Sequence, residues 1–96
     1  MLTKLKNRIN RAILVIRHAR AMWRALTNPK NERKGDWRGI PLDELLSQMD
    51  REVEELKLAL WQHSKGECGP ERVEEEGADV SCFVAFISDA NRMKRS

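Results

Sequence analysis

The sequence is poor in the residues that build disulfide frameworks and zinc sites. It contains only two cysteines and two histidines in 96 residues. Cys68 and Cys82 are not closely spaced, and neither His18 nor His63 accompanies them at zinc-ligand spacing, which argues against a zinc site. We expect Cys82 to be a small buried side chain in a helix and Cys68 to be a loop thiol, as in the reduced cytoplasm.

The chain also lacks the apolar runs that mark membrane proteins and secretory signals. The apolar stretch 12–16 has five residues and ends at Arg17, which is too short for a signal peptide or a transmembrane helix. The G-x-x-x-x-G-K pattern of a phosphate-binding loop is missing as well. We therefore expect a cytoplasmic protein that has no membrane partner.

Sustained alternation of apolar and polar residues, the mark of a strand, is absent too. The sequence predicts an all-α fold, a single domain forming a compact helical bundle of three to four main helices. We expect a long basic helix at 1–28, a loop at 29–40, and further helices at 41–62 and 71–92. A chain of this length buries only about 60–65% of its unfolded surface, so assembly into an oligomer would stabilise it considerably.

Charge is divided unevenly along the chain. Residues 1–38 hold eleven Lys/Arg against two acids, whereas residues 39–96 hold seven against thirteen. Apolar residues of the first helix recur every three or four positions and form a heptad-like seam: Leu2, Leu5, Ile9, Ala12, Ile16, Ala19, Trp23 and Leu26. We expect the middle of this helix, widened by residues 13–15, to pack on the two later helices and the rest to pack on a second subunit.

A different function class fits the same helix. Its basic side chains suit a non-enzymatic helical adaptor that binds nucleic acid with a steep salt dependence: Lys4, Lys6, Arg8, Arg11, Arg17, Arg20 and Arg24. The acidic second half would repel a phosphate backbone, which makes nucleic acid the less favoured partner.

Two pairs of carboxylates carry the strongest chemical signal. Glu52 and Glu55 are three residues apart, as are Glu76 and Asp79, and this spacing puts each pair on one helix face. The second pair falls among the apolar residues of its helix, and the first flanks a leucine-rich stripe, so packing of the two stripes would bring four carboxylates together. Each like-charge contact at ~4 Å costs on the order of 4 kcal/mol at a dielectric of ~20. Mg²⁺ or Mn²⁺, which prefer carboxylate oxygens, are the natural neutralising ions.

Two further segments supply candidate nucleotide-binding residues. Trp37 stands alone in a charged loop, where it either caps the core or forms an aromatic wall for a base, with Lys34 and Arg38 near phosphates. Asn91 and Lys94 either belong to a frayed basic helix end or contact the nucleotide and its phosphates. For the carboxylates, the plain alternative is a solvated acidic surface.

The sequence resembles the small phage and prokaryotic type of MazG-like, all-α nucleoside triphosphate pyrophosphohydrolases. The resemblance rests on the ExxE motif before Leu56, the ExxD motif before Val80, the twenty residues that separate them, and the run Lys34-Gly35-Asp36-Trp37-Arg38. It covers residues 34–94, and the preceding segment carries no matching motif. The resemblance implies metal-dependent cleavage of a (d)NTP between its α- and β-phosphates into (d)NMP and pyrophosphate, with purine dNTPs among the candidate substrates.

The resemblance also implies the roles of the acidic residues. Glu52, Glu55, Glu76 and Asp79 would hold about two to three Mg²⁺ or Mn²⁺ ions per site. The expected catalytic residues are Glu52, Glu55 and Glu54, with Glu52 or Glu54 orienting the attacking water. A homodimer or homotetramer is the implied assembly, and the host cytoplasm is the expected compartment for a phage-encoded member.

Overall fold

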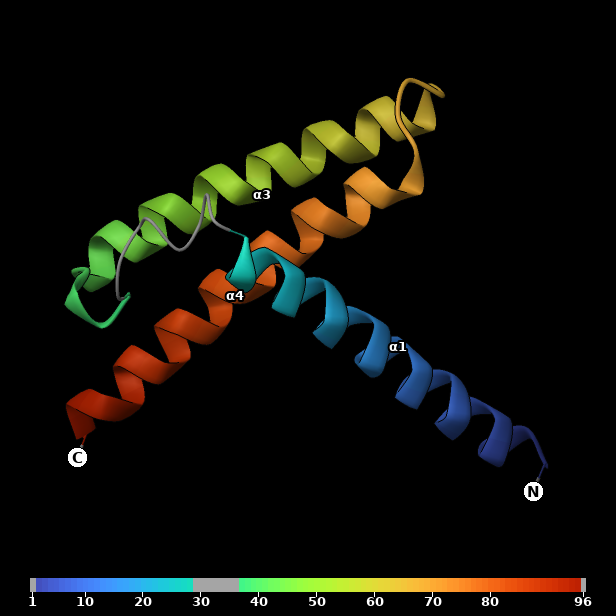
Figure 1. Cartoon of the computed structure of the whole chain (residues 1–96), viewed down its shortest axis with the longest axis horizontal. Coiled ribbons are helices and arrows are strands. Elements are labelled where there is room, and N and C mark those ends of the chain that lie inside the picture. The colour runs from blue at the N-terminus through green and yellow to red at the C-terminus, as the bar shows by residue number, and fades with distance from the viewer. Residues whose placement is uncertain (1, 29–36, 96) are drawn as a thin grey trace.

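The computed structural model describes the backbone of residues 2–28 and 37–95, with side chains as far as residue 92. Within these ranges the chain forms three long helices, one 3-10 turn and no strand, which confirms the all-α prediction. The elements are α1 (Leu2–Thr27), η1 (Trp37–Gly39), α3 (Leu42–Ser64) and α4 (Pro70–Arg95). Figure 1 shows α3 and α4 running antiparallel side by side, with α1 leading away from the middle of α4.

Proline and glycine set the helix boundaries. α1 ends at Thr27, ahead of the Asn28-Pro29 step that disfavours further helix. Pro41 precedes α3, and its carbonyl oxygen accepts hydrogen bonds from the backbone N–H groups of Glu44 and Leu45 in the first turn. After α3 the chain reverses through Gly66, whose φ of 76° lies in the left-handed region that favours glycine.

The core lies along the seam between α3 and α4. Leu45 and Ala59 of α3 are fully buried, and α4 contributes Ala78, Cys82 and Phe83. Cys82 is a buried free thiol, and Cys68 is a half-buried free thiol in the connection, where its Sγ donates to the Ala59 carbonyl. Both cysteines therefore match their predicted positions, and burial, followed by the charge of Asp79, raises the pKa of Cys82 to about 11.

α1 packs on α4 through small and polar side chains. Ala21 is buried, His18 Nε2 lies 2.6 Å from Ser81 Oγ, and Cys82 Sγ lies 3.7 Å from the Met22 carbonyl oxygen. A solvent-accessible ion pair between Arg24 and Glu74 adds a further link. The contact lies on the carboxyl-terminal half of α1, so the remainder of the helix extends beyond it (Figure 1).

The expected packing of the middle of α1 on the two later helices was wrong, whereas the expected contact of the rest of its seam with a second subunit stays a prediction. Ile16 is 58% exposed and Trp23 is 67% exposed, and the widened middle at residues 13–15 is exposed as well. The seam faces away from α4 because the contact uses the opposite side of the helix, where His18, Ala21 and Met22 lie. The radius of gyration is 15.8 Å, above the roughly 12.5 Å expected for a compact domain of this length, because α1 leads away from the other helices.

None of the described helices combines the length and apolar character that crossing a bilayer requires.

Candidate metal centre

Carboxylates from both helices of the α3–α4 pair meet at its middle. Glu52 of α3 and Glu76 and Asp79 of α4 each offer an oxygen that lies within 4.8 Å of the others. All three side chains are half-buried. The two motifs meet because α3 and α4 are antiparallel and their connection is short, which places Glu52 and Glu76 at matching heights along the seam.

The cluster carries unfavourable charge in the absence of a cation. Burial, followed by the neighbouring charges of Glu55, Asp79 and Glu76 in that order, raises the pKa of Glu52 to about 7. The pKa of Glu76 is also raised, first by burial and then by Glu55 and Asp79. These shifts show that the folded chain disfavours the fully ionised cluster.

The donor set fits a hard divalent cation. Glu52 Oε2 and Glu76 Oε2 are shielded from solvent and accept no hydrogen bond from the described residues. A buried carboxylate oxygen without a partner is costly, and an oxygen-binding cation would compensate both of these oxygens together. Carboxylates at this spacing are typical ligands of Mg²⁺ and Mn²⁺, so the residues present fit the expected metal.

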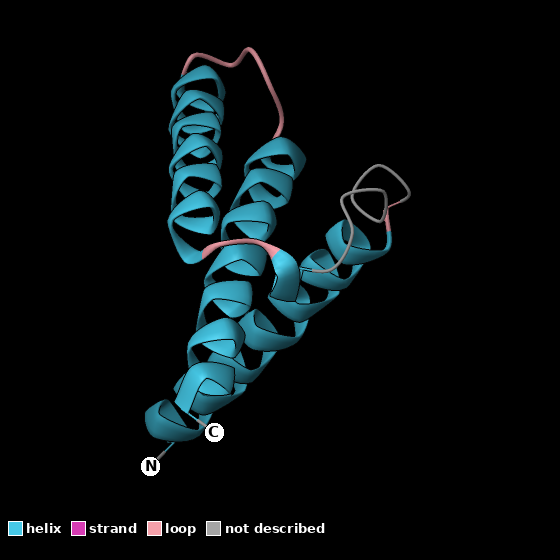
Figure 2. Ribbon diagram, turned by 90° about the vertical axis from the view of Figure 1, so that its left-hand side faces the viewer, coloured by secondary structure: helices cyan, strands magenta, loops and turns pink. Residues whose placement is uncertain are grey.

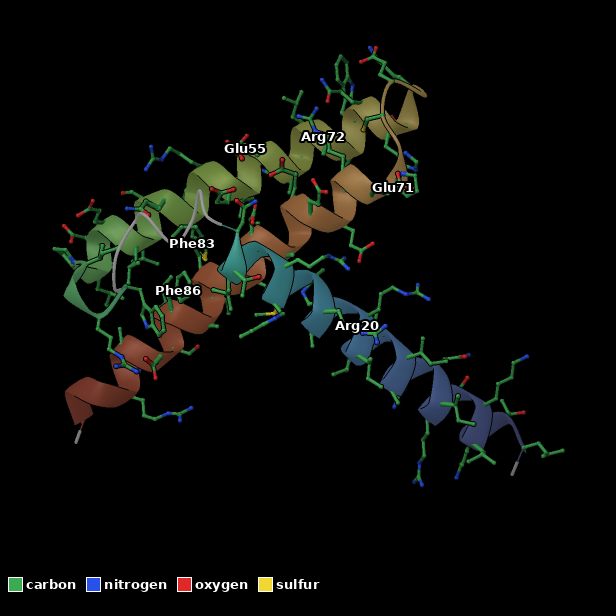
Figure 3. The ribbon with its side chains drawn as sticks, in the orientation of Figure 1. Arg20, Glu55, Glu71, Arg72, Phe83 and Phe86 are labelled. Atoms are coloured by element: carbon green, nitrogen blue, oxygen red, sulfur yellow. The ribbon has the colours of Figure 1, made fainter. Side chains whose placement is uncertain are left out.

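Glu55 and Arg72 lie beside the cluster (Figure 3). Glu55 is exposed, yet its charge raises the pKa of both Glu52 and Glu76. Arg72 lowers the pKa of Glu76, and it stands four residues earlier on the same helix face. The sequence analysis did not single out Arg72, although its i,i+4 spacing from Glu76 is a readable signal.

Glu54 does not join the cluster. Its side chain is 72% exposed, and its Oε1 accepts from the Lys57 ammonium at 3.2 Å. It lies two positions after Glu52, which turns it about 200° around α3 and onto the outer surface. Of the two carboxylates expected to orient a water molecule, only Glu52 therefore lies in the cluster.

Trp37 packs against the carboxyl-terminal half of α4. Its ring stacks on Phe86 with centroids 4.8 Å apart, and its Nε1 donates to Asp89 Oδ2 at 3.1 Å. The Arg38 guanidinium lies 5.3 Å from the Trp37 ring centroid and pairs with Asp89. Figure 2 shows η1 lying against α4. Trp37 thus covers the end of the core, and its predicted contact with a base stays a prediction.

The structure does not bring the other candidate nucleotide-binding residues next to the carboxylate cluster. Asn91 is exposed on α4, twelve residues beyond Asp79 and therefore about 18 Å further along the helix axis. Lys34 and the side chain of Lys94 lie outside the described residues. Of the predicted site, the structure brings together Glu52, Glu55, Glu76 and Asp79.

Comparison of the chain with protein-family models, with curated proteins and with solved structures gave no match. The resemblance to MazG-like enzymes therefore rests on the sequence motifs alone.

Proposed function

We propose that the protein is a metal-dependent (d)NTP pyrophosphohydrolase that cleaves between the α- and β-phosphates, giving (d)NMP and pyrophosphate. The observation that carries the proposal is the convergence of Glu52, Glu76 and Asp79, in which two buried oxygens receive no hydrogen bond from the described part of the chain. A bound cation would neutralise the repelling charges of this cluster, and a hard divalent cation in turn favours a phosphate-bearing substrate. The ExxE and ExxD motifs add the reaction type through the family resemblance.

The proposal assigns a separate role to each residue of the cluster. Glu52, Glu76 and Asp79 hold Mg²⁺ or Mn²⁺ between α3 and α4, with Glu55 at the open edge of the cluster. The bound metal supplies Lewis acidity and lowers the pKa of water. Glu52 would accept a proton from the attacking water through an oxygen that the metal leaves unoccupied.

Positive charge beside the cluster suits the polyphosphate. Arg72 lies close enough to lower the pKa of Glu76, and its exposed side chain is free to turn toward a phosphate oxygen. Arg38 holds a second positive charge next to Trp37. In this arrangement the phosphates lie near the middle of α4 and the base lies toward Trp37.

An activity assay with charge-neutral variants tests the proposal. The wild-type protein is incubated with each (d)NTP and Mg²⁺ or Mn²⁺, and the products are separated into monophosphate, diphosphate, pyrophosphate and phosphate. Monophosphate with pyrophosphate, lost on chelation and in Asp79→Asn, supports the assignment. Release of diphosphate and phosphate would place cleavage at the β–γ bond and contradict it.

A further inference from the structure

Three apolar lines on the described helices follow a seven-residue repeat. The described residues leave the α1 line exposed and the other two lines exposed or half-buried. On α1 the line is Leu2, Ile9, Ile16 and Trp23, each at least 51% exposed. On α3 it is Leu46, Val53 and Leu60, and on α4 it is Val73, Val80 and Ile87, with exposed Val84 beside them. A seven-residue repeat on a helix is the pattern that packs against another helix.

The lines on α3 and α4 lie on one side of the helix pair. Leu46 follows buried Leu45, and Val84 follows buried Phe83, so each turns about 100° from the seam. The two helices are antiparallel, so an approximate two-fold axis relates them. A turn of about 100° in the chain direction therefore places Leu46 of α3 and Val84 of α4 on the same side of the helix pair. α1 contacts α4 through Ser81 and Cys82, which turn about 160° and 100° away from Phe83, so α1 lies on the side of α4 that faces away from α3. We call the side with Leu46 and Val84 the free face.

Gly77 gives a separate indication that a helix approaches the free face. It lies within α4 between Val73 and Val84, where glycine costs roughly 1 kcal/mol relative to alanine. A Cβ added at Gly77 would meet nothing within 4 Å. Packing inside the described chain therefore does not require glycine at this position. Close approach of a helix from another copy would require it, because a side chain here would hold the two backbones apart.

We propose that the free face binds the α1 seam of a second copy of this chain. Charge selects this occupant: α1 carries seven exposed Lys/Arg and no acidic residue. On α3 the free face is bordered by Asp43 and Asp50 and by Lys57, whose charge is balanced by its ion pair with Glu54. Pairing α1 with α1 would bring like charges together. The chain's own α1 packs on the side of α4 that faces away from α3, through the His18–Ser81 contact, and its seam is exposed and available to a neighbour. Figure 3 labels Arg20, one of the exposed basic side chains of α1.

An open groove lies at the carboxyl-terminal end of the same seam. It is lined by Ile16, Ala19, Arg20, Trp23 and Arg24. The small side chain of Ala19 between larger neighbours lets an apolar side chain of a facing helix enter, in the manner of a knob in a hole. The proposal concerns assembly and stands independently of the proposed activity.

The test measures self-association of four variants by sedimentation velocity, with circular dichroism as the check of folding. Ile9→Asp disrupts the α1 seam and Leu46→Asp disrupts the free face. Asn10→Asp and Ser47→Asp are their matched controls, because they introduce the same charge at exposed neighbouring positions off the two surfaces. We expect Ile9→Asp and Leu46→Asp each to weaken association by roughly tenfold or more, and both controls to associate like the wild type.

Photo-crosslinking identifies the contact directly and does not depend on the stability of a disruptive variant. A benzophenone amino acid replaces Ile9 in one isotope-labelled copy, which is mixed with an unlabelled wild-type copy. Crosslinks to α3 or α4 of the other copy are the expected result. Three results would overturn the proposal: a monomeric wild-type protein, crosslinks between two α1 helices, or a monomer that binds anionic vesicles or nucleic acid through α1.

Discussion

Glu52 of α3 and Glu76 of α4 face each other across the helix seam, and each keeps one solvent-shielded oxygen that accepts no hydrogen bond from the described residues. Two such oxygens in one place are a local cost to folding. A stability cost concentrated at one cluster is typical of functional sites, where the fold arranges groups for a ligand and not for its own stability.

Replacing Glu76 by Gln separates this function from stability. We expect Glu76→Gln to lose turnover by roughly a hundredfold or more because a metal-binding carboxylate is removed. Its thermal stability in chelator should equal or exceed that of the wild type, because one repelling charge disappears. Glu75→Gln is the matched control, since Glu75 is the exposed neighbour on the same helix. An active Glu76→Gln variant with normal metal dependence would remove Glu76 from the site.

The metal-free protein should lose stability as the pH rises. The pKa of Glu52 is raised from 4.5 to about 7 in the folded state, so the folded chain binds a proton that the unfolded chain releases. The resulting stabilisation is complete below pH 4.5 and is lost as the pH rises through about 7. After allowance for solvent screening, the effect is about 1 kcal/mol, equivalent to about 4–8 °C in Tm.

Thermal unfolding of wild type and Glu52→Gln in chelator at pH 5 and pH 8 measures this effect. The wild-type Tm should fall between the two pH values by more than that of the variant, and added Mn²⁺ should raise the wild-type Tm at pH 8. Parallel pH dependence in the two proteins would show that Glu52 is not the group responsible.

Trp37 should contribute to stability whatever its role toward a ligand. Trp37→Ala removes the stack on Phe86 and the hydrogen bond to Asp89, and we expect a loss of roughly 2–4 kcal/mol in the free energy of unfolding. Trp37→Phe keeps a ring for Phe86 but not the donor, so its loss should be about 1 kcal/mol. Urea denaturation measures both. Equal stability of Trp37→Ala and wild type would contradict the observed packing.

Local sequence signals were sufficient to predict the positions of the helices and the residues of the acidic cluster. Pro29 and Pro41 act on the backbone directly, and the ExxE and ExxD spacings determine which carboxylates share a face before any tertiary contact forms. These features depend only on neighbours in the chain, which is why helix positions and the meeting of Glu52 with Glu76 and Asp79 were predictable.

The packing of α1 depends on information that apolar spacing does not contain. The seam pattern shows that Ile16 and Trp23 share a face, but it does not say which neighbour that face contacts. The contact that forms uses Ala21 and a hydrogen bond between His18 and Ser81. Small or polar residues carry little hydrophobic signal even though they let helices approach closely. Glu54 was misplaced for a simpler reason, since proximity to Glu52 in sequence does not place two residues on one helix face.

The most direct test of the central claim is product analysis of a panel of NTPs and dNTPs, each incubated with the wild-type protein in Mg²⁺, in Mn²⁺ and in chelator. The account predicts nucleoside monophosphate and pyrophosphate in equal amounts, formed only with metal and lost in Glu76→Gln but not in Glu75→Gln. A folded protein that releases no product from any nucleotide with either metal would contradict it.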